Sequence, residues 1–129
     1  MIHTPQGITL IDNAYSSNPI SAQFSLEVFK DLECKGRKIL VTPGFAELGK
    51  EQDREHFILG QRAAEVSDAV FLIGNEKRIA PIVKGLLDKG FLQADIHVNL
   101  SMQETRKAMA EFLKPGDLVL IENDLPDVY

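Results

Sequence analysis

The sequence predicts an α/β fold in which an open, mostly parallel, doubly wound sheet carries helices on both faces. Short runs rich in Ile, Val and Leu alternate with longer segments whose apolar residues recur at the helical period. These runs are almost continuously apolar, as strands are when helices cover both faces of a parallel sheet. Because crossovers between parallel strands are right-handed, the alternation leads to a doubly wound sheet.

Length and composition indicate a single globular domain. The chain has 129 residues and a formal net charge of −5, and its one cysteine, Cys34, allows no internal disulfide. The dispersed Lys and Arg residues argue against a nucleic-acid or anionic-membrane surface. No apolar run approaches the roughly 20 residues of a membrane-spanning helix. We therefore expect a cytoplasmic protein that neither binds nucleic acid nor inserts into a membrane.

Strand and helix signals alternate through the first half of the chain. Residues 7–12 form the first predicted strand, and Asn18-Pro19 is an N-cap followed by proline at the first helical position. The next predicted elements are a strand at 38–42, a helix from about 51 to 66 and a strand at 69–74. In the helix that starts at Pro19, apolar residues at four-residue steps mark one face, namely Ile20, Phe24, Val28 and Leu32.

The second half repeats this rhythm. Asn75 is placed to cap a helix that Gly90 ends, and a strand at 95–98 follows. Ser101 and Glu104 form a capping box, in which each side chain accepts from a free amide of the first helical turn. The last predicted strand is 118–122. The predicted apolar faces of the two helices are Ile79, Ile82, Val83 and Leu86, and Thr105, Ala108, Met109 and Phe112.

Polar residues follow the predicted strands, which is where open α/β sheets bind ligands. The richest segment runs from Asp12 to Pro19 and leads into a helix N-terminus, where free amides and the helix dipole favour an anion. Asp12 could accept hydrogen bonds from ribose hydroxyls, and Tyr15, Ser16 and Asn18 could bond to a nucleotide. The same residues fit a structural explanation, in which Asn18 is a helix cap and the serines fill a turn.

The sequence carries no other complete pattern for catalysis or metal binding. Neither the glycine-rich dinucleotide loop nor the triphosphate-binding P-loop occurs in it. His3, His56 and His97 lack the paired spacing of metal ligands. No arrangement of Ser, His and Asp has a supporting motif. The residues alone thus predict an α/β domain with a polar rim and an incomplete set of catalytic groups.

Five stretches of the chain form a pattern when they are taken together. They are Ile11-Asp-Asn-Ala-Tyr-Ser-Ser-Asn-Pro19, Ala46-Glu-Leu-Gly49, His56 with Gly60, Asp68-Ala-Val-Phe-Leu-Ile-Gly74, and Leu113-Lys-Pro-Gly-Asp-Leu-Val-Leu-Ile121. In this order they resemble the C-terminal domain of the Mur ligase family, above all the members that add D-alanyl-D-alanine. The resemblance extends over nearly the whole chain, which makes it stronger than any single motif.

This resemblance implies that residues 1–129 are one domain of a three-domain enzyme. In Mur ligases one domain binds the UDP-sugar, a central domain carries the ATP-binding P-loop, and a C-terminal Rossmann-like domain closes over both. ATP and Mg²⁺, held mainly by the central domain, serve to form an acyl phosphate on the growing peptide, which the incoming amine attacks. The expected reaction is addition of D-Ala-D-Ala to the UDP-N-acetylmuramoyl tripeptide. The closing domain would position the amine and exclude water, and it would be inactive alone.

Matching positions imply roles for individual residues, with no catalytic and no metal-binding residue in this domain. The nucleotide side would take Asp12, Asn13, Tyr15, Ser16 and Asn18, and the acceptor side Glu47, Leu48, Gly49, Glu122, Asn123 and Asp124. His56 matches a family-typical position and is expected to be structural.

The chain departs from the family pattern at three places. Asn13 and Ser16 stand where many members have Asp and Asn, and Glu122-Asn-Asp-Leu125 replaces the usual Lys-Gly-Ser-Arg after the last strand. Carboxylates in place of cations would change how an anionic acceptor is recognised.

Two other functions remain open from the sequence. One is a freestanding α/β module that binds a nucleotide or a partner through the same polar rim, which a native gene encoding this domain alone would favour. The other is the closing domain of a related ligase, of the folylpolyglutamate or cyanophycin type. The Tyr-x-x-Asn-Pro and Glu-Leu-Gly pieces favour the D-alanyl-D-alanine members instead.

Overall fold

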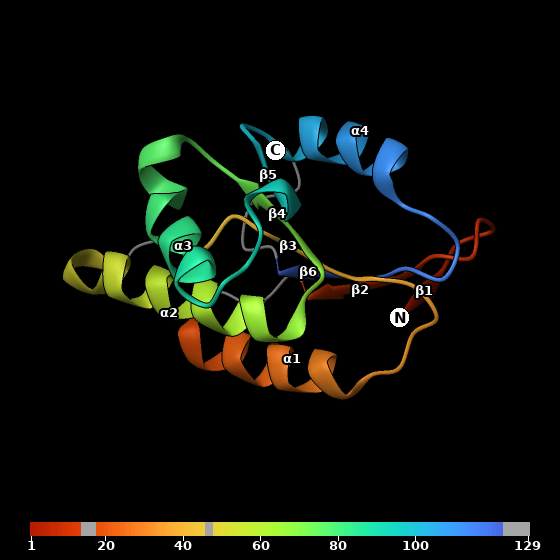
Figure 1. The fold of residues 1–129 in the computed structure, drawn as a ribbon, viewed down its shortest axis with the longest axis horizontal. Helices are drawn as coiled ribbons and strands as arrows, with labels where there is room; N and C mark the ends of the chain where they lie inside the picture. Colours follow the sequence, from red (N-terminus) through yellow and green to blue (C-terminus); the bar gives the residue numbers. More distant parts are fainter. Residues whose placement is uncertain (14–17, 46–47, 123–129) are drawn as a thin grey trace.

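A six-stranded sheet forms the centre of the computed structural model, which describes residues 1–13, 18–45 and 48–122 (Figure 1). The strands are β1 (Ile2–His3), β2 (Thr9–Asn13), β3 (Lys38–Thr42), β4 (Ala69–Ile73), β5 (Ile96–Asn99) and β6 (Leu118–Glu122). The helices are α1 (Pro19–Asp31), α2 (Gln52–Val66), α3 (Glu76–Asp88) and α4 (Met102–Phe112), with 3₁₀ turns η1 (Gly49–Glu51) and η2 (Gln93–Asp95).

The strand order β1-β2-β6-β3-β4-β5 confirms the predicted fold class. All neighbouring strands are parallel except β1 and β2. Helices α1, α2 and α3 cover one face of the sheet, and α4 covers the other (Figure 1). The last strand, β6, lies between β2 and β3, so the carboxyl ends of the first and last parallel strands are neighbours.

Strand β1 was missed by the sequence reasoning, which places His3 in an irregular N-terminus. Ile2 pairs with Leu10 and His3 with Thr9 in an antiparallel register. A tight turn at Gly7, with φ +85°, reverses the chain between the two strands. Two residues are too few to produce a hydrophobic period, which explains why no pattern indicated this strand.

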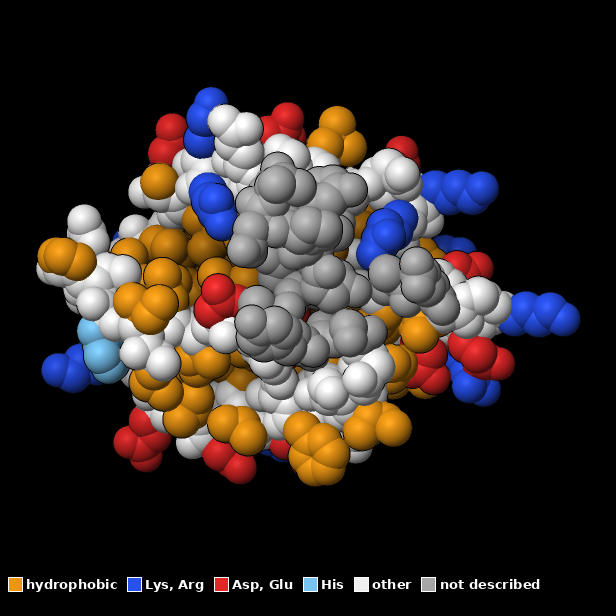
Figure 2. Space-filling view, turned by 180° about the vertical axis from the view of Figure 1, so that it is seen from behind, with side chains coloured by type: hydrophobic (Ala, Val, Ile, Leu, Met, Phe, Trp, Pro, Cys, Tyr) orange, Lys and Arg blue, Asp and Glu red, His pale blue; other side chains and the backbone are white. Residues whose placement is uncertain are grey.

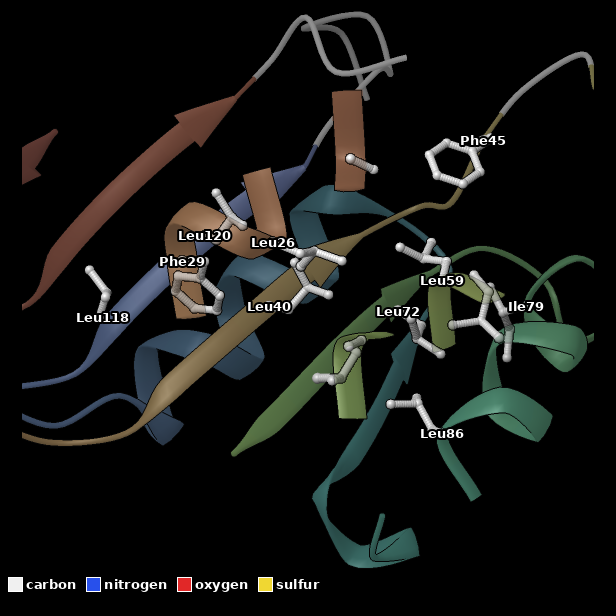
Figure 3. Packing of buried hydrophobic residues seen from close by; sticks show 14 residues of the cluster. Leu26, Phe29, Leu40, Phe45, Leu59, Leu72, Ile79, Leu86, Leu118 and Leu120 are labelled. Atoms are coloured by element: carbon white, nitrogen blue, oxygen red, sulfur yellow. The ribbon is translucent and has the colours of Figure 1, made fainter. Parts of the chain in front are cut away.

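The core has one hydrophobic cluster on each face of the sheet. The larger cluster joins β3, β4 and β6 to α1, α2 and α3, and Figure 3 shows Leu40 and Leu72 of the sheet together with Leu26, Leu59 and Leu86 of the helices. The smaller cluster packs the opposite sheet face against α4. Both faces of the central strands are thus buried, as their continuous apolar sequences predict.

Helix α1 buries a different face from the one marked by the four-residue pattern. Ala22, Leu26 and Phe29 are its buried residues. Three of the four residues of the predicted stripe are exposed instead: Ile20 is 68% exposed, Phe24 65% and Val28 60%, whereas Leu32 packs partly against the core. The helix has two apolar stripes, and periodicity by itself does not tell which one faces the sheet.

The helix starts follow the predicted caps. The side-chain oxygens of Asn18, Asn75 and Ser101 accept from the amides of Ser21, Arg78 and Glu104 at 2.9, 2.9 and 3.1 Å. Glu104 departs from the expected capping box in one respect, because its carboxylate accepts from the amide of Leu100, which precedes the helix. No helix of the described residues is both long and apolar enough to cross a bilayer.

Helices α2 and α3 cross in close contact at two glycines. A Cβ atom built on Gly60 would overlap the carbonyl oxygen of Ile82, and one on Gly85 would overlap that of Phe57. The family-like His-x-x-x-Gly spacing on α2 therefore has a packing explanation for its glycine.

A buried ion pair fixes the chain where it enters β3 and β6. Asp117, 2% exposed, accepts from the backbone amides of Arg37 and Lys114 at 3.0 and 2.8 Å and forms an ion pair with the Arg37 guanidinium at 2.7 Å. Burial would raise the pKa of Asp117, but these hydrogen bonds from Arg37 and Lys114 hold it below its ordinary value.

Candidate functional site

The carboxyl ends of β2 and β6 bring together residues that the sequence assigns to different sides of the site. Asn13 lies opposite Glu122 in the parallel register. The Asn13 side-chain amide donates to the Ser25 hydroxyl of α1 and lies 3.4 and 3.5 Å from the two carboxylate oxygens of Glu122. Glu122 is only 4% exposed. Asn13 therefore links two strand ends and a helix at the edge of the sheet.

A hollow of about 300 Å³ opens beside this edge, between α1 and the strands β2 and β6. Asp12 and Asn13 lie at its polar part, and Asp12 is exposed to solvent. The remaining lining is mostly apolar, consisting of Ile11, Phe24, Val28, Phe29 and Leu120 together with Ser25. An apolar wall with a carboxylate and an amide nearby suits a ligand that has a flat or apolar part and donating hydroxyl groups.

The other residues expected on the nucleotide side are only partly described. Asn18 caps α1, which supports its structural explanation without excluding a further contact. Tyr15 and Ser16 lie outside the described residues. Of the five residues, the structure thus brings Asp12 and Asn13 to the hollow.

Side chains from two helices form hydrogen bonds to the backbone of the residues after β3. The imidazole Nε2 of His56 accepts from the backbone amide of Phe45 at 2.8 Å. Gln52 donates to the Phe45 carbonyl at 2.6 Å and accepts from the amide of Leu48 at 3.2 Å. Arg78 of α3 donates to the carbonyls of Pro43 and Phe45 at 3.0 and 3.2 Å. The backbone of Pro43, Phe45 and Leu48 is therefore held by three side chains.

His56 is the most buried of these three side chains and has no exposed surface. Burial and then the nearby charge of Arg78 lower its pKa, so the folded protein favours the neutral ring. Since Nε2 accepts a hydrogen bond, the ring hydrogen belongs on Nδ1, which is buried without a partner among the described residues. A Cβ on Gly44, where φ is +80°, would overlap the ring. These contacts agree with the structural role expected for His56.

His97 provides a second, partly buried ring at the other side of the fold. It lies on β5, stacks on Phe71 with ring centroids 4.4 Å apart, and has a buried Nε2 without a partner among the described residues. Burial is the main cause that lowers its pKa. His97 thus resembles His56 in environment but holds no loop.

Three contributors to these arrangements were not singled out from the sequence. Ser25, Gln52 and Arg78 act on partners that lie 12, 7 and 35 positions away along the chain. Only Gln52 had a local signal, since it lies one helical turn before His56. The acceptor-side residues Glu47, Asn123 and Asp124 lie outside the described residues. Among the residues that are described, no group of three or more His, Cys, Asp or Glu side chains could hold a metal ion.

Comparisons with known proteins agree on one family. Residues 1–122 match the family described as Mur ligase, glutamate ligase domain. The UDP-N-acetylmuramoyl-tripeptide–D-alanyl-D-alanine ligase of Bacillus subtilis is 29% identical over 123 residues, which are 95% of this chain and 26% of that protein. The ligase of the same name from Mycobacterium tuberculosis is 27% identical over 132 residues, covering 90% of this chain and 26% of that protein.

Solved structures show the same fold. The MurF ligase from Thermotoga maritima in complex with ADP superposes with a TM-score of 0.72 at 25% identity, over 94% of this chain and 26% of that one. MurF from Acinetobacter baumannii gives a TM-score of 0.67 at 19% identity, over 87% and 23% of the two chains. The chain thus spans about a quarter of the length of the curated relatives it matches. With nearly all of its residues matched to one domain, the chain belongs to the Mur ligase family.

Proposed function

We propose that this chain is the C-terminal closing domain of a three-domain, ATP-dependent ligase that adds D-Ala-D-Ala to UDP-N-acetylmuramoyl tripeptide for peptidoglycan synthesis. The observation that carries the proposal is the match over residues 1–122 to one Mur ligase domain, together with relatives that bear this ligase's name. Because the chain corresponds to a quarter of those relatives, the activity would belong to a longer polypeptide. We place that polypeptide in the cytoplasm, in line with its single cysteine in this domain.

We propose that the polar part of the hollow faces the nucleotide. The exposed carboxylate of Asp12 can accept hydrogen bonds from ribose hydroxyls, and the side chain of Asn13, the next residue along β2, is held by Ser25 and Glu122. The T. maritima relative was solved with ADP, which supports a nucleotide near this domain. No Lys or Arg is among the described residues that line the hollow, so the phosphates and Mg²⁺ would be held by another domain.

The acceptor side of the proposed site would be the segment ending at Leu48 and Gly49. The backbone of Phe45 and Leu48 is held by His56, Gln52 and Arg78, so it could position an incoming amine without reorganising. We also propose Glu47, Asn123 and Asp124 for the acceptor side, as the resemblance implies. The buried carboxylate of Glu122 bonds to Asn13, and we assign to it support of Asn13 rather than direct contact with the acceptor.

Phosphate release from ATP tests the proposal. The full-length gene product should release phosphate only when UDP-N-acetylmuramoyl tripeptide and D-Ala-D-Ala are both present, and the 129-residue chain should release none. Ligation by the isolated chain would overturn the assignment of the closing role.

The variant Asp12→Ala in the full-length protein tests the nucleotide contact. It should raise the KM for ATP about 10-fold, the equivalent of one hydrogen bond to a charged group, and leave the KM for the UDP-sugar unchanged. Asp31→Ala, at the far end of α1, removes another exposed carboxylate and should change neither value. Equal loss for both substrates would point to a folding defect and count against the contact.

A further inference from the structure

Helix α1 is apolar on two opposite sides. Ala22, Leu26 and Phe29 face the core, while Ile20, Phe24 and Val28 remain 60–68% exposed. Positions 20, 24 and 28 are offset by two residues from 22 and 26, which is roughly 200° around a helix. A surface helix normally keeps its outer side polar, and a helix that is apolar all round is usually buried. We call Ile20, Phe24 and Val28 the α1 outer face.

Helix α4, which covers the opposite face of the sheet, shows that a helix of this fold does not need an apolar outer side. The exposed residues of α4 are Gln103, Glu104, Arg106, Lys107, Ala110 and Glu111. Five of these six residues are polar or charged. Of the seven exposed residues of α1, four are polar or charged (Gln23, Glu27, Lys30 and Asp31), but the other three are large and apolar. Solvent alone thus gives no reason for the α1 outer face.

The α1 outer face continues into the hollow beside β2. Phe24 and Val28 line that hollow together with Ile11 and Leu120, and Asp12 and Asn13 lie at its polar part. Figure 2 shows hydrophobic side chains gathered along the lower margin of the molecule, where α1 lies in Figure 1. A partner seated on the α1 outer face would therefore also cover the edge that carries Asp12.

The size of the α1 outer face favours contact between domains of one chain over a dimer. At about two-thirds exposure, three side chains of this kind present on the order of 350 Å². A stable complex of two chains needs about 800 Å² from each partner. Contacts between domains of one polypeptide bury about 600–1,500 Å² in total, so this area suffices for one side. The curated relatives have nearly three quarters of their length outside the matched part, which supplies such domains.

We propose that the α1 outer face is the docking surface for an apolar face of another domain of the same polypeptide, which it meets when the domains close. This inference rests on the proposed function, because it requires the longer chain. Docking there would remove Phe24 and Val28 from water and close the hollow at the same time. The apolar contact would then hold the closed state, while Asp12 engages the nucleotide.

Thiol labelling of the full-length protein tests this docking. Phe24→Cys, in a Cys34→Ser background, reports on the α1 outer face, and Lys107→Cys on α4 is the control at an exposed position of the opposite side. With an unreactive ATP analogue and the UDP-sugar bound, a maleimide should react at least about 10-fold more slowly at position 24 than in the isolated 129-residue chain. Reaction at position 107 should be equal in the two proteins. Val28→Cys repeats the test if the first variant folds poorly.

The outcomes separate this proposal from the proposed function. Equal labelling of position 24 in both proteins overturns the docking surface, and a ligase assay on the natural full-length protein shows whether the function stands. Protection of position 24, together with no ligase activity of the natural full-length protein, supports docking and overturns the function. Protection of position 24 that disappears on dilution would indicate a second copy of the chain and overturn docking within one polypeptide. A gene that encodes this chain alone overturns both proposals.

Discussion

Replacing His56 by leucine tests whether its ring holds the backbone at Phe45. The ring is fully buried, and its Nε2 is the acceptor for the Phe45 amide at 2.8 Å. Leucine has a similar volume and no acceptor, so the variant leaves that amide buried without its partner. We expect the free energy of unfolding to fall by about 1–3 kcal/mol at pH 7. Glutamine can place an oxygen near the Nε2 position, so His56→Gln should lose less than about 1 kcal/mol.

The same variant should change the pH dependence of stability. Burial lowers the pKa of His56 from its ordinary 6.5. The unfolded chain therefore takes up a proton near pH 6.5, whereas the folded chain resists protonation until lower pH. Stability is full above that value and falls as the pH drops toward the folded pKa. His97 contributes in the same direction, because burial lowers its pKa as well. His56→Leu should remove one of these two contributions.

Urea unfolding followed by circular dichroism at pH 7 and pH 5 measures both effects. His97→Gln is the control for the loop contact, since it changes a partly buried ring that holds no loop. In two-dimensional NMR spectra, the amide signals of Leu48 and Gly49 should shift in His56→Leu and stay in place in His97→Gln. A leucine variant with the stability, acid sensitivity and Leu48 signal of the natural protein would refute the reasoning.

Two further substitutions test the packing of the fold. Gly60→Ala should lower the free energy of unfolding in urea by about 1–3 kcal/mol, because its Cβ would overlap the Ile82 carbonyl. At an exposed helical position alanine would instead stabilise by about 1 kcal/mol over glycine. A gain in stability would therefore contradict the close crossing of α2 and α3. Asp117→Asn should cost about 1.5–3 kcal/mol at pH 7 by weakening the hydrogen bonds from Arg37. Because the folded pKa of Asp117 is lowered, its contribution is present above about pH 4 and lost as the pH falls further, so the two proteins should converge in stability in acid.

The sequence predicts most of the fold because its signals are local. Proline after Asn18, the cap at Asn75 and the continuous apolar run at 69–74 each specify an element without reference to the rest of the chain. Strand β1 was not predicted because it forms by pairing with β2, and its own two residues carry no strand signal. The buried face of α1 was not predicted for another reason. The helix has two apolar stripes, and only its packing on the sheet determines which one is buried.

The site could be predicted only as far as strand ends indicate it. Asp12 and Asn13 are the last two residues of β2, and that position alone placed them at the ligand-binding edge. The neighbours of Asn13 depend on β6 lying beside β2, which the sheet order brings about across a sequence separation of 109 positions. Likewise, Arg78 reaches Pro43 only because α3 follows the adjacent strand. Such pairings belong to the tertiary structure, and no local pattern contains them.

The register of β2 and β6 gives a physical reason for two departures from the family pattern. Many Mur ligases that this chain resembles carry Asp where Asn13 stands and Lys where Glu122 stands, and these positions face each other here. Asp opposite Lys makes an ion pair, whereas Asp opposite Glu122 would place two carboxylates together at a buried site. Asn13 avoids that repulsion, because its amide can donate to Glu122.

The two departures should therefore be coupled energetically. Asn13→Asp alone should destabilise the chain by about 1–3 kcal/mol at pH 7, and less at pH 5, where one carboxyl can take up a proton. Combining Asn13→Asp with Glu122→Lys should recover most of the loss, so that the effects of the two single variants do not add. Additive losses in urea unfolding would mean that the two positions change independently. Coupling would instead imply that Glu122 entered this chain as the partner of Asn13, which leaves recognition of the acceptor to residues other than the family's lysine.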